Sequence, residues 1–146
     1  MIDCACPVCD GPSVSVSMER NIRIGSRSAE VLDEFLRCTK CDEEFYLPGQ
    51  MDALQLRASA RIREEEGLLQ PREVRAIRQG LGLSQSDFER LLGVGPKTVV
   101  RWEKGTVFQN RATDALLRLV RDVPGSARLL SERSGVELGE GVTRGR

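Results

Sequence analysis

The cysteines are the residues of this chain whose spacing points most directly to a chemistry. Four of the five form two CxxC pairs, Cys6 with Cys9 and Cys38 with Cys41. Each pair can wrap a tight turn that directs two thiolates at one ion, and two such turns supply the four sulfur ligands that tetrahedral Zn²⁺ accepts. The spacing therefore predicts one metal site with these four cysteines as ligands and Zn²⁺ as the bound ion.

Other uses of the cysteines fit the sequence less well. A thioredoxin-like redox site needs one CxxC in a βαβ setting, which the pattern does not show. Iron is the main alternative to zinc, because it accepts the same four thiolates. Cys4 can replace Cys6 as a ligand, but Cys6 keeps the two-residue spacing. Four protein ligands leave no open position for water or substrate, so we expect a structural site.

A second pattern, between residues 80 and 105, is typical of two short helices that meet at a glycine turn. Ser84 is a good N-cap, and apolar residues follow it at helical spacing, so a first helix is expected over about 85–92. Gly93 then permits a sharp turn. This is the pattern of a helix-turn-helix, whose second helix lies in the major groove of DNA.

The second helix is expected over about 96–104. Pro96 suits a first helical turn, and Gly105 suits the left-handed residue that follows a helix. Val99 and Trp102 lie three residues apart and are predicted to be the buried pair. The opposite side then offers hydrogen bonds to guanine edges and phosphates, and an apolar contact to thymine.

With the start of the first helix included, seven residues are predicted to contact double-stranded DNA: Ser84, Gln85, Lys97, Thr98, Val100, Arg101 and Lys104. The alternative is an ordinary helical hairpin with a charged, solvated face. The order of N-cap, glycine turn, proline start and Trp-Glu-Lys-Gly end favours the DNA-reading helix. Because such helices read palindromic operators in pairs, we expect a homodimer.

Charge is balanced over the whole chain but unevenly distributed along it. Residues 71–122 hold ten basic and six acidic side chains, a net charge of +4. Residues 1–70 hold eight basic and thirteen acidic side chains, a net charge of −5. A basic half suits DNA, and an acidic half suits a basic protein partner. The asymmetry indicates two domains with different partners.

Several classes of protein are excluded by what the sequence lacks. It has no run of about twenty apolar residues and no N-terminal signal peptide, so we expect a cytoplasmic protein with no membrane partner. It has no histidine and no glycine-rich phosphate loop. We therefore expect no enzymatic activity.

The first half is expected to form a small antiparallel sheet. Short alternating or apolar stretches predict strands over 13–18, 21–24, 34–37 and 44–47, and good helix formers predict a helix over 50–66. A sheet this small buries too little apolar area by itself. The metal ion would supply the missing folding free energy.

These elements predict an α+β protein of two domains. Residues 1–67 form a zinc-bound β domain, and a linker at 67–71 leads to an all-α helix-turn-helix domain at 68–134. Further helices are expected over 72–79, 112–123 and 126–133. The helix expected over 112–123 carries an apolar stripe that is either a dimer seam or part of the domain's own core. Its members are Leu116, Leu119, Val120 and Val123.

The last stretch, residues 135–146, is expected to be a disordered tail. It contains Gly135, Gly139, Gly141 and Gly145 and little apolar surface to bury. No motif within it indicates a function.

The motifs together resemble a known family. LSQ at 83–85, LLGV at 91–94 and TVVRWEKG at 98–105 match phage-repressor-like (Xre/Cro type) helix-turn-helix domains. Preceded by CPxC and CxxC pairs with a sheet between them, this domain resembles the MqsA family of antitoxins over about residues 6–122. One residue departs from the pattern, because Glu89 stands where the family usually has a small residue near the helix crossing.

The resemblance implies that the zinc domain holds a ribonuclease toxin, a basic protein encoded next door. It implies that the C-terminal domain dimerises and represses the operon of both proteins. Arg101 falls on the family's base-reading arginine, whereas Lys97 replaces an asparagine. Asparagine suits adenine and lysine suits guanine or phosphate, so the operator is expected to differ.

A second hypothesis remains open. The sequence is also consistent with a stand-alone helix-turn-helix transcriptional regulator. In such a protein the zinc domain is structural, or it senses metal or oxidant through Cys4. The neighbouring reading frame distinguishes the two, because a short basic protein encoded there favours the antitoxin.

Overall fold

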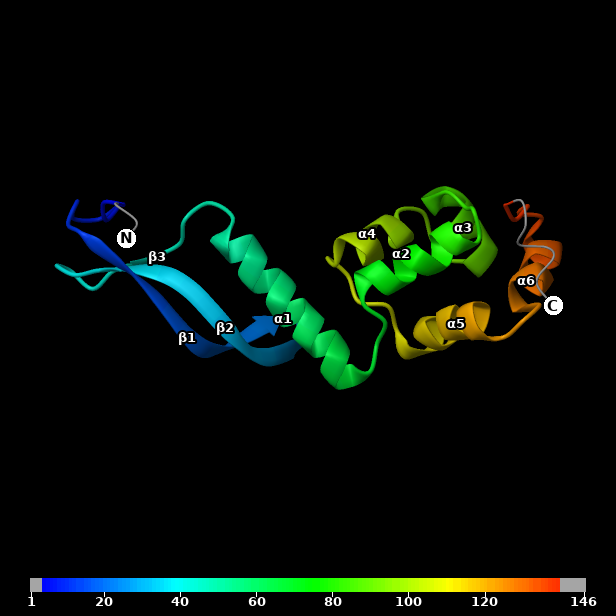
Figure 1. The fold of residues 1–146 in the computed structure, drawn as a ribbon, viewed down its shortest axis with the longest axis horizontal. Coiled ribbons are helices and arrows are strands. Elements are labelled where there is room, and N and C mark those ends of the chain that lie inside the picture. Colours follow the sequence, from blue (N-terminus) through cyan, green and yellow to red (C-terminus); the bar gives the residue numbers. More distant parts are fainter. Residues whose placement is uncertain (1–3, 140–146) are drawn as a thin grey trace. The chain divides into compact units, whose positions relative to one another are not determined.

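A computed structural model of the 146-residue chain describes residues 4–139. These residues form an α+β fold, as predicted, with a three-stranded antiparallel sheet followed by six helices (Figure 1). The chain divides between Ile62 and Arg63 into two compact units, called here the sheet unit and the helical unit. Within the described residues, no helix is long and apolar enough to cross a membrane.

The sheet unit is a long hairpin with a short third strand. β1 (Ser13–Ile24) pairs antiparallel with β2 (Arg27–Cys38) along its full length, and β2 also pairs with β3 (Glu44–Phe45). Two residues connect β1 to β2. The first of them, Gly25, has a φ of +63°, the left-handed backbone that the first position of a type II′ hairpin turn requires.

The strands differ in extent from those that the sequence predicts. Stretches 13–18 and 21–24 form one continuous strand, β1. β2 begins at Arg27 rather than at residue 34, and β3 covers only the first half of the predicted 44–47. Acidic residues and alanine, which are rare in strands, conceal the first half of β2 in the sequence.

A buried carboxylate inside the sheet explains how these charged stretches remain strands. Asp33 is 0% exposed and lies between Val31 and Phe35 on the inner face of β2. Its Oδ2 accepts hydrogen bonds from the Tyr46 hydroxyl at 2.9 Å and from the Arg20 guanidinium at 3.2 Å. Paired in this way, the charges continue the strands instead of ending them.

The first helix, α1 (Gln50–Glu66), belongs to both units. Its first turns pack Leu54 against Val31 in the small core of the sheet unit. Its last turn contributes Arg63 to the helical unit, where the guanidinium lies 4.6 Å from the centre of the Phe108 ring. The division of the chain therefore falls within α1 and not in the linker that the sequence predicts.

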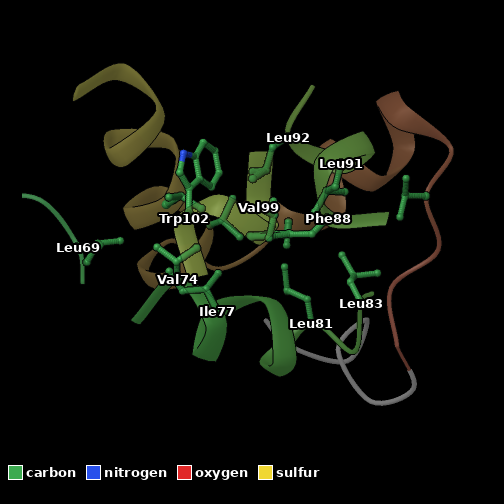
Figure 2. Packing of buried hydrophobic residues seen from close by; sticks show 14 residues of the cluster. Leu69, Val74, Ile77, Leu81, Leu83, Phe88, Leu91, Leu92, Val99 and Trp102 are labelled. Carbon is green, nitrogen blue, oxygen red and sulfur yellow. The ribbon is translucent and has the colours of Figure 1, made fainter. Parts of the chain in front are cut away.

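Five further helices build the helical unit around one hydrophobic core, which Figure 2 shows from close by. Phe88, Val99 and Leu117 are fully buried there, and Trp102 packs beside them. The predicted buried pair of the second short helix is thus confirmed. The helices are α2 (Pro71–Gly80), α3 (Gln85–Leu92), α4 (Thr98–Lys104), α5 (Arg111–Asp122) and α6 (Ser126–Ser134).

Two expectations for these helices are wrong. α4 begins at Thr98 and not at Pro96, because Lys97 has a φ of +68°, outside the helical region. On α5, Val120 is buried in the unit's own core and is not available to a dimer seam. Leu119 and Val123, which are 52% and 46% exposed, are the members of the predicted stripe that remain on the surface.

The expectation of a disordered tail is wrong for residues 135–139. Val136 is 3% exposed, and Leu138 packs against the same core. The Gly139 N–H donates to the Leu81 carbonyl at 2.8 Å. A Cβ built on Gly139 would lie 2.8 Å from the Cα of Gly82, so this close backbone crossing needs glycine. Residues 140–146 of the predicted tail lie outside the described part.

We expect Val136→Ala to lower the stability of the helical unit by about 1.5–3 kcal/mol, because a fully buried valine is lost from its core. Leu129→Ala on α6 is the control, since Leu129 is 59% exposed and its truncation should cost less than about 0.5 kcal/mol. Urea unfolding followed by Trp102 fluorescence measures both. Equal midpoints for the two variants would contradict a packed C-terminal segment.

Candidate functional site

The structure brings the four predicted ligand cysteines into one cluster. The sulfurs of Cys6, Cys9, Cys38 and Cys41 all lie within 4.8 Å of one another. Two pairs are closer, with 3.6 Å between the sulfurs of Cys6 and Cys41 and 3.4 Å between those of Cys9 and Cys38. Sulfurs at the corners of a tetrahedron around a metal about 2.3 Å away are about 3.8 Å apart. The cluster therefore has the size of a four-coordinate metal site.

Each CxxC pair is a tight turn with the same backbone pattern. The N–H of Asp10 donates to the Cys6 carbonyl at 2.9 Å, and the N–H of Asp42 donates to the Cys38 carbonyl at 3.1 Å. Both aspartates have left-handed backbones, with φ of 61° and 63°. The sequence repeats Cys-Asp at both places, and aspartate is one of the few residues that adopt this conformation readily.

Backbone bonds and a glycine bring the two turns together. The Thr39 N–H in the second turn donates to the carbonyl of Pro12, just after the first turn, at 2.9 Å. A Cβ on Gly11 would lie 3.0 Å from the Lys40 Cβ and 3.1 Å from the Cys9 sulfur. Any larger residue at position 11 would push the turns and their sulfurs apart.

The close packing of the cysteines shifts their thiol pKa values in opposite directions. The N–H groups of Cys41 and Lys40 donate to the Cys38 sulfur, at 3.4 and 3.3 Å, and lower the pKa of Cys38 to about 6. For Cys41, the Glu43 N–H lowers the pKa, but the neighbouring Cys9 sulfur and desolvation outweigh it and raise the pKa to about 12. Close thiolates repel one another, so a bound cation would favour the deprotonated form of all four cysteines.

Cys4 lies outside this cluster. Its carbonyl accepts a hydrogen bond from the Ser13 hydroxyl, and its thiol is not among the four sulfurs that converge. Cys6, and not Cys4, is therefore the residue that joins the other three cysteines in the cluster.

The helix-turn-helix residues divide between core and surface on α4. Val99 and Trp102 face the core, whereas Lys97, Arg101 and Lys104 are exposed. Thr98 and Val100 are half-buried at the border between the two faces. This short helix thus presents a basic outer side over an apolar inner side.

α3 begins at the residue that the sequence predicts, and the Ser84 hydroxyl before it already takes part in a hydrogen bond within the protein. It accepts the N–H of Asp87 at 3.1 Å and caps the helix. Gln85, the first residue of α3, is half-buried. Lys97 precedes α4 as its N-cap, and its carbonyl accepts the Arg101 N–H at 3.2 Å. Lys97 thus lies one turn before Arg101, although its own backbone is not helical.

Comparison with known proteins adds the decisive observation. A model of the family described as "Antitoxin component of bacterial toxin-antitoxin system, MqsA" matches residues 4–132, which include both CxxC pairs and all of α1 to α5. The chain belongs to the MqsA antitoxin family. The match ends before Val136, so the packed segment at 135–139 lies beyond the part that the family model covers.

Curated relatives of this MqsA-family chain include a transcriptional regulator. The Uncharacterized HTH-type transcriptional regulator YiaG of Escherichia coli K12 is 37% identical over 60 residues. The same regulator from strain CFT073 and from E. coli O157:H7 matches equally well. The aligned segment covers 41% of this chain and 62% of each relative, so the chain spans less than two thirds of their length.

Two buried polar contacts that position α4 are not predicted from the sequence. Arg78 on α2 forms a two-pronged ion pair with Glu103 on α4, with N–O distances of 2.8 and 2.9 Å, and Glu103 raises the pKa of Arg78. The Glu89 carboxylate on α3 accepts the Val99 N–H at 2.9 Å. The sequence does signal Glu89, as the residue that departs from the family pattern.

We expect Cys38→Ser to lower the metal content of this MqsA-family protein well below about one ion per chain, because one of the four converging thiolate ligands is lost. Loss of the ion should also open the sheet unit to protease. Cys4→Ser is the matched control and should keep the parent's metal content. Elemental analysis with limited proteolysis measures both effects, and a parent protein that purifies without any transition metal would rule the site out.

Proposed function

We propose that this chain is the antitoxin of a type II toxin-antitoxin pair. Its sheet unit binds a ribonuclease toxin and neutralises it, and its helical unit represses the operon of both proteins. The observation that carries the proposal is the basic outer side of α4, held on a buried Val99 and Trp102, in a chain of the MqsA antitoxin family. The E. coli regulator-like segment supports the DNA-binding half.

The proposed contacts to DNA follow from the positions on α4. Arg101 is exposed in the middle of the helix, and its guanidinium can donate two hydrogen bonds to one guanine in the major groove. Lys97, one turn earlier, is placed to hold a phosphate. Thr98 and Val100 offer a hydroxyl and an apolar contact, and Lys104 adds a charge at the other end. Ser84 and Gln85 lie at the start of α3, where a backbone contact is expected.

The ion that fits the cluster best is Zn²⁺. Four thiolates at tetrahedral spacing are the donor set of structural zinc sites, which have no position left for a substrate. When bound, the ion ties both turns to the sheet and supplies folding free energy to a unit with a small core. We therefore assign no catalysis to this chain, and we place it in the cytoplasm, where its cysteines stay reduced.

The sheet supplies an acidic surface for the toxin. Strand register places Glu19, Glu30 and Glu34 on one face of the hairpin, opposite the face on which Val31 packs against α1. All three glutamates are exposed. Residues 1–70 carry a net charge of −5, so a basic partner is attracted over a long range at low salt.

We infer a homodimer, because one short reading helix makes few contacts and two-fold repressors read palindromic sites. The exposed surface members of the predicted stripe are Leu119 on α5 and Val123, the C-cap of that helix. In a two-fold interface the same patch of both copies meets, so these residues would contact their own copy.

The second candidate is a stand-alone transcriptional regulator, which the likeness to the regulator YiaG favours. It shares the DNA contacts and differs only in the partner of the sheet unit. A short basic protein encoded beside this chain favours the antitoxin, and its absence favours the regulator.

The toxin hypothesis predicts an electrostatic interface on the sheet. The double variant Glu30→Lys and Glu34→Lys should weaken binding of the adjacent gene product and flatten its salt dependence. These residues face Asn21 and Ser17 across the hairpin, so the change breaks no cross-strand ion pair. Glu137→Lys, in the helical unit, is the control, because it also replaces an acidic side chain by a basic one. Isothermal titration over a salt series checks this, and equal binding by all three proteins would move the interface elsewhere.

The DNA hypothesis predicts separable roles for two side chains. Arg101→Ala should cost about 1–3 kcal/mol on operator DNA and relax preference at one base pair per half-site. Lys97→Gln should weaken binding to all sequences alike and reduce the salt slope by about one unit. A salt titration on operator and scrambled duplexes, with two chains expected per operator, measures both.

Trp102→Ala is the control for folding, because the loss of this buried ring should destabilise the unit by about 3–5 kcal/mol. If Arg101→Ala stays folded and binds both duplexes as the parent does, α4 is not the reading helix.

A further inference from the structure

Glu89 on α3 is a buried carboxylate that points at the start of the proposed reading helix. Its residue is 7% exposed, and its Oε2 accepts the backbone N–H of Val99, the second residue of α4, at 2.9 Å. The bond joins two helices and is itself buried. A carboxylate in this place is hydrogen-bonded to the positive end of a helix dipole.

The start of α4 needs such an acceptor, because its N-cap supplies none. The first N–H groups of a helix have no partner within the helix. Lys97 is the N-cap, has a left-handed backbone and makes no side-chain capping bond. The Thr98 N–H reaches the Gly95 carbonyl only at 3.4 Å. Glu89 is therefore the side chain that caps α4, from a neighbouring helix.

We propose that Glu89 is a positioning residue for DNA reading, which fixes the start of α4 against α3 so that Thr98 and Arg101 meet the base edges in one orientation. The inference rests on the proposed DNA-binding function. It gives a role to the residue that departs from the family pattern, because a small apolar side chain in its place would offer no acceptor. Glu89 touches no base and acts through the backbone of Val99.

The carboxylate has two effects on DNA binding that oppose each other. As an acceptor it holds the helix in register, which favours the operator over other sequences. As an anion near the N-terminus of α4, it weakens the attraction of that helix end for phosphates of any sequence. Glutamine keeps an oxygen acceptor and removes the charge, whereas alanine removes both, so the two substitutions separate the effects.

The probes are a duplex from the region upstream of this chain's own reading frame and a scrambled duplex of equal length. Glu89→Ala should lower the ratio of operator to scrambled affinity about tenfold, since a buried donor loses its partner. Glu89→Gln should keep the ratio and tighten binding to both duplexes alike. Asp87→Asn removes one charge from the exposed side of the same helix and should also keep the ratio.

Amide hydrogen exchange of full-length protein without DNA tests the cap by itself. The Val99 amide should exchange faster in Glu89→Ala than in the parent and remain protected in Glu89→Gln. Unchanged exchange of Val99 in a folded Glu89→Ala protein overturns the proposal, and so does an unchanged affinity ratio in that variant.

Failure of the DNA-binding function gives a different result. In that case the parent itself does not distinguish the two duplexes, while the exchange of Val99 still decides whether Glu89 caps α4. Loss of thermal stability with an unchanged affinity ratio would reduce Glu89 to a structural residue and overturn its positioning role.

Discussion

The sheet unit of this chain is too small to be held together by apolar burial alone, and polar links at fixed points supply the remaining constraint. In the sheet unit the buried apolar cluster around α1 consists of Val31, Leu54 and Ala58. A hairpin so lightly covered is marginal in water. The convergence of four sulfurs at the end where β1 begins and β2 ends therefore decides whether this unit has one structure, because it closes the loop between the two CxxC turns.

The helical unit has a larger core, yet its proposed reading helix has only seven residues. Helices of that length do not persist alone, so α4 depends on its surroundings. Val99 and Trp102 fix its inner face, while the ion pair of Arg78 with Glu103 and the cap from Glu89 fix its rotation and its start. Directional contacts of this kind restrict orientation more strongly than apolar packing, which tolerates small rotations.

How much the sequence predicts depends on the range of the interactions. The ligand set, the Ser84 cap, the buried Val99 and Trp102 and the order of the helices are local or periodic signals, and the structure agrees with them. The full length of β2 is hidden because Asp33 looks like a strand end until its partners across the sheet are known. The packing of Val136 cannot be predicted from the sequence either. The glycine-rich stretch that contains it carries no signal that it packs against residues 81 and 82.

Lys97 and Glu89 are best understood together. A left-handed backbone costs a residue such as lysine about 1–2 kcal/mol, whereas asparagine, the residue of the family pattern, adopts it more easily and can also bond locally. Lys97 makes no side-chain capping bond and contributes a long cationic side chain. The start of the helix is capped instead by the Glu89 carboxylate from α3. At this helix end Lys97 therefore adds a positive charge, whereas Glu89 supplies the cap and limits the positive field.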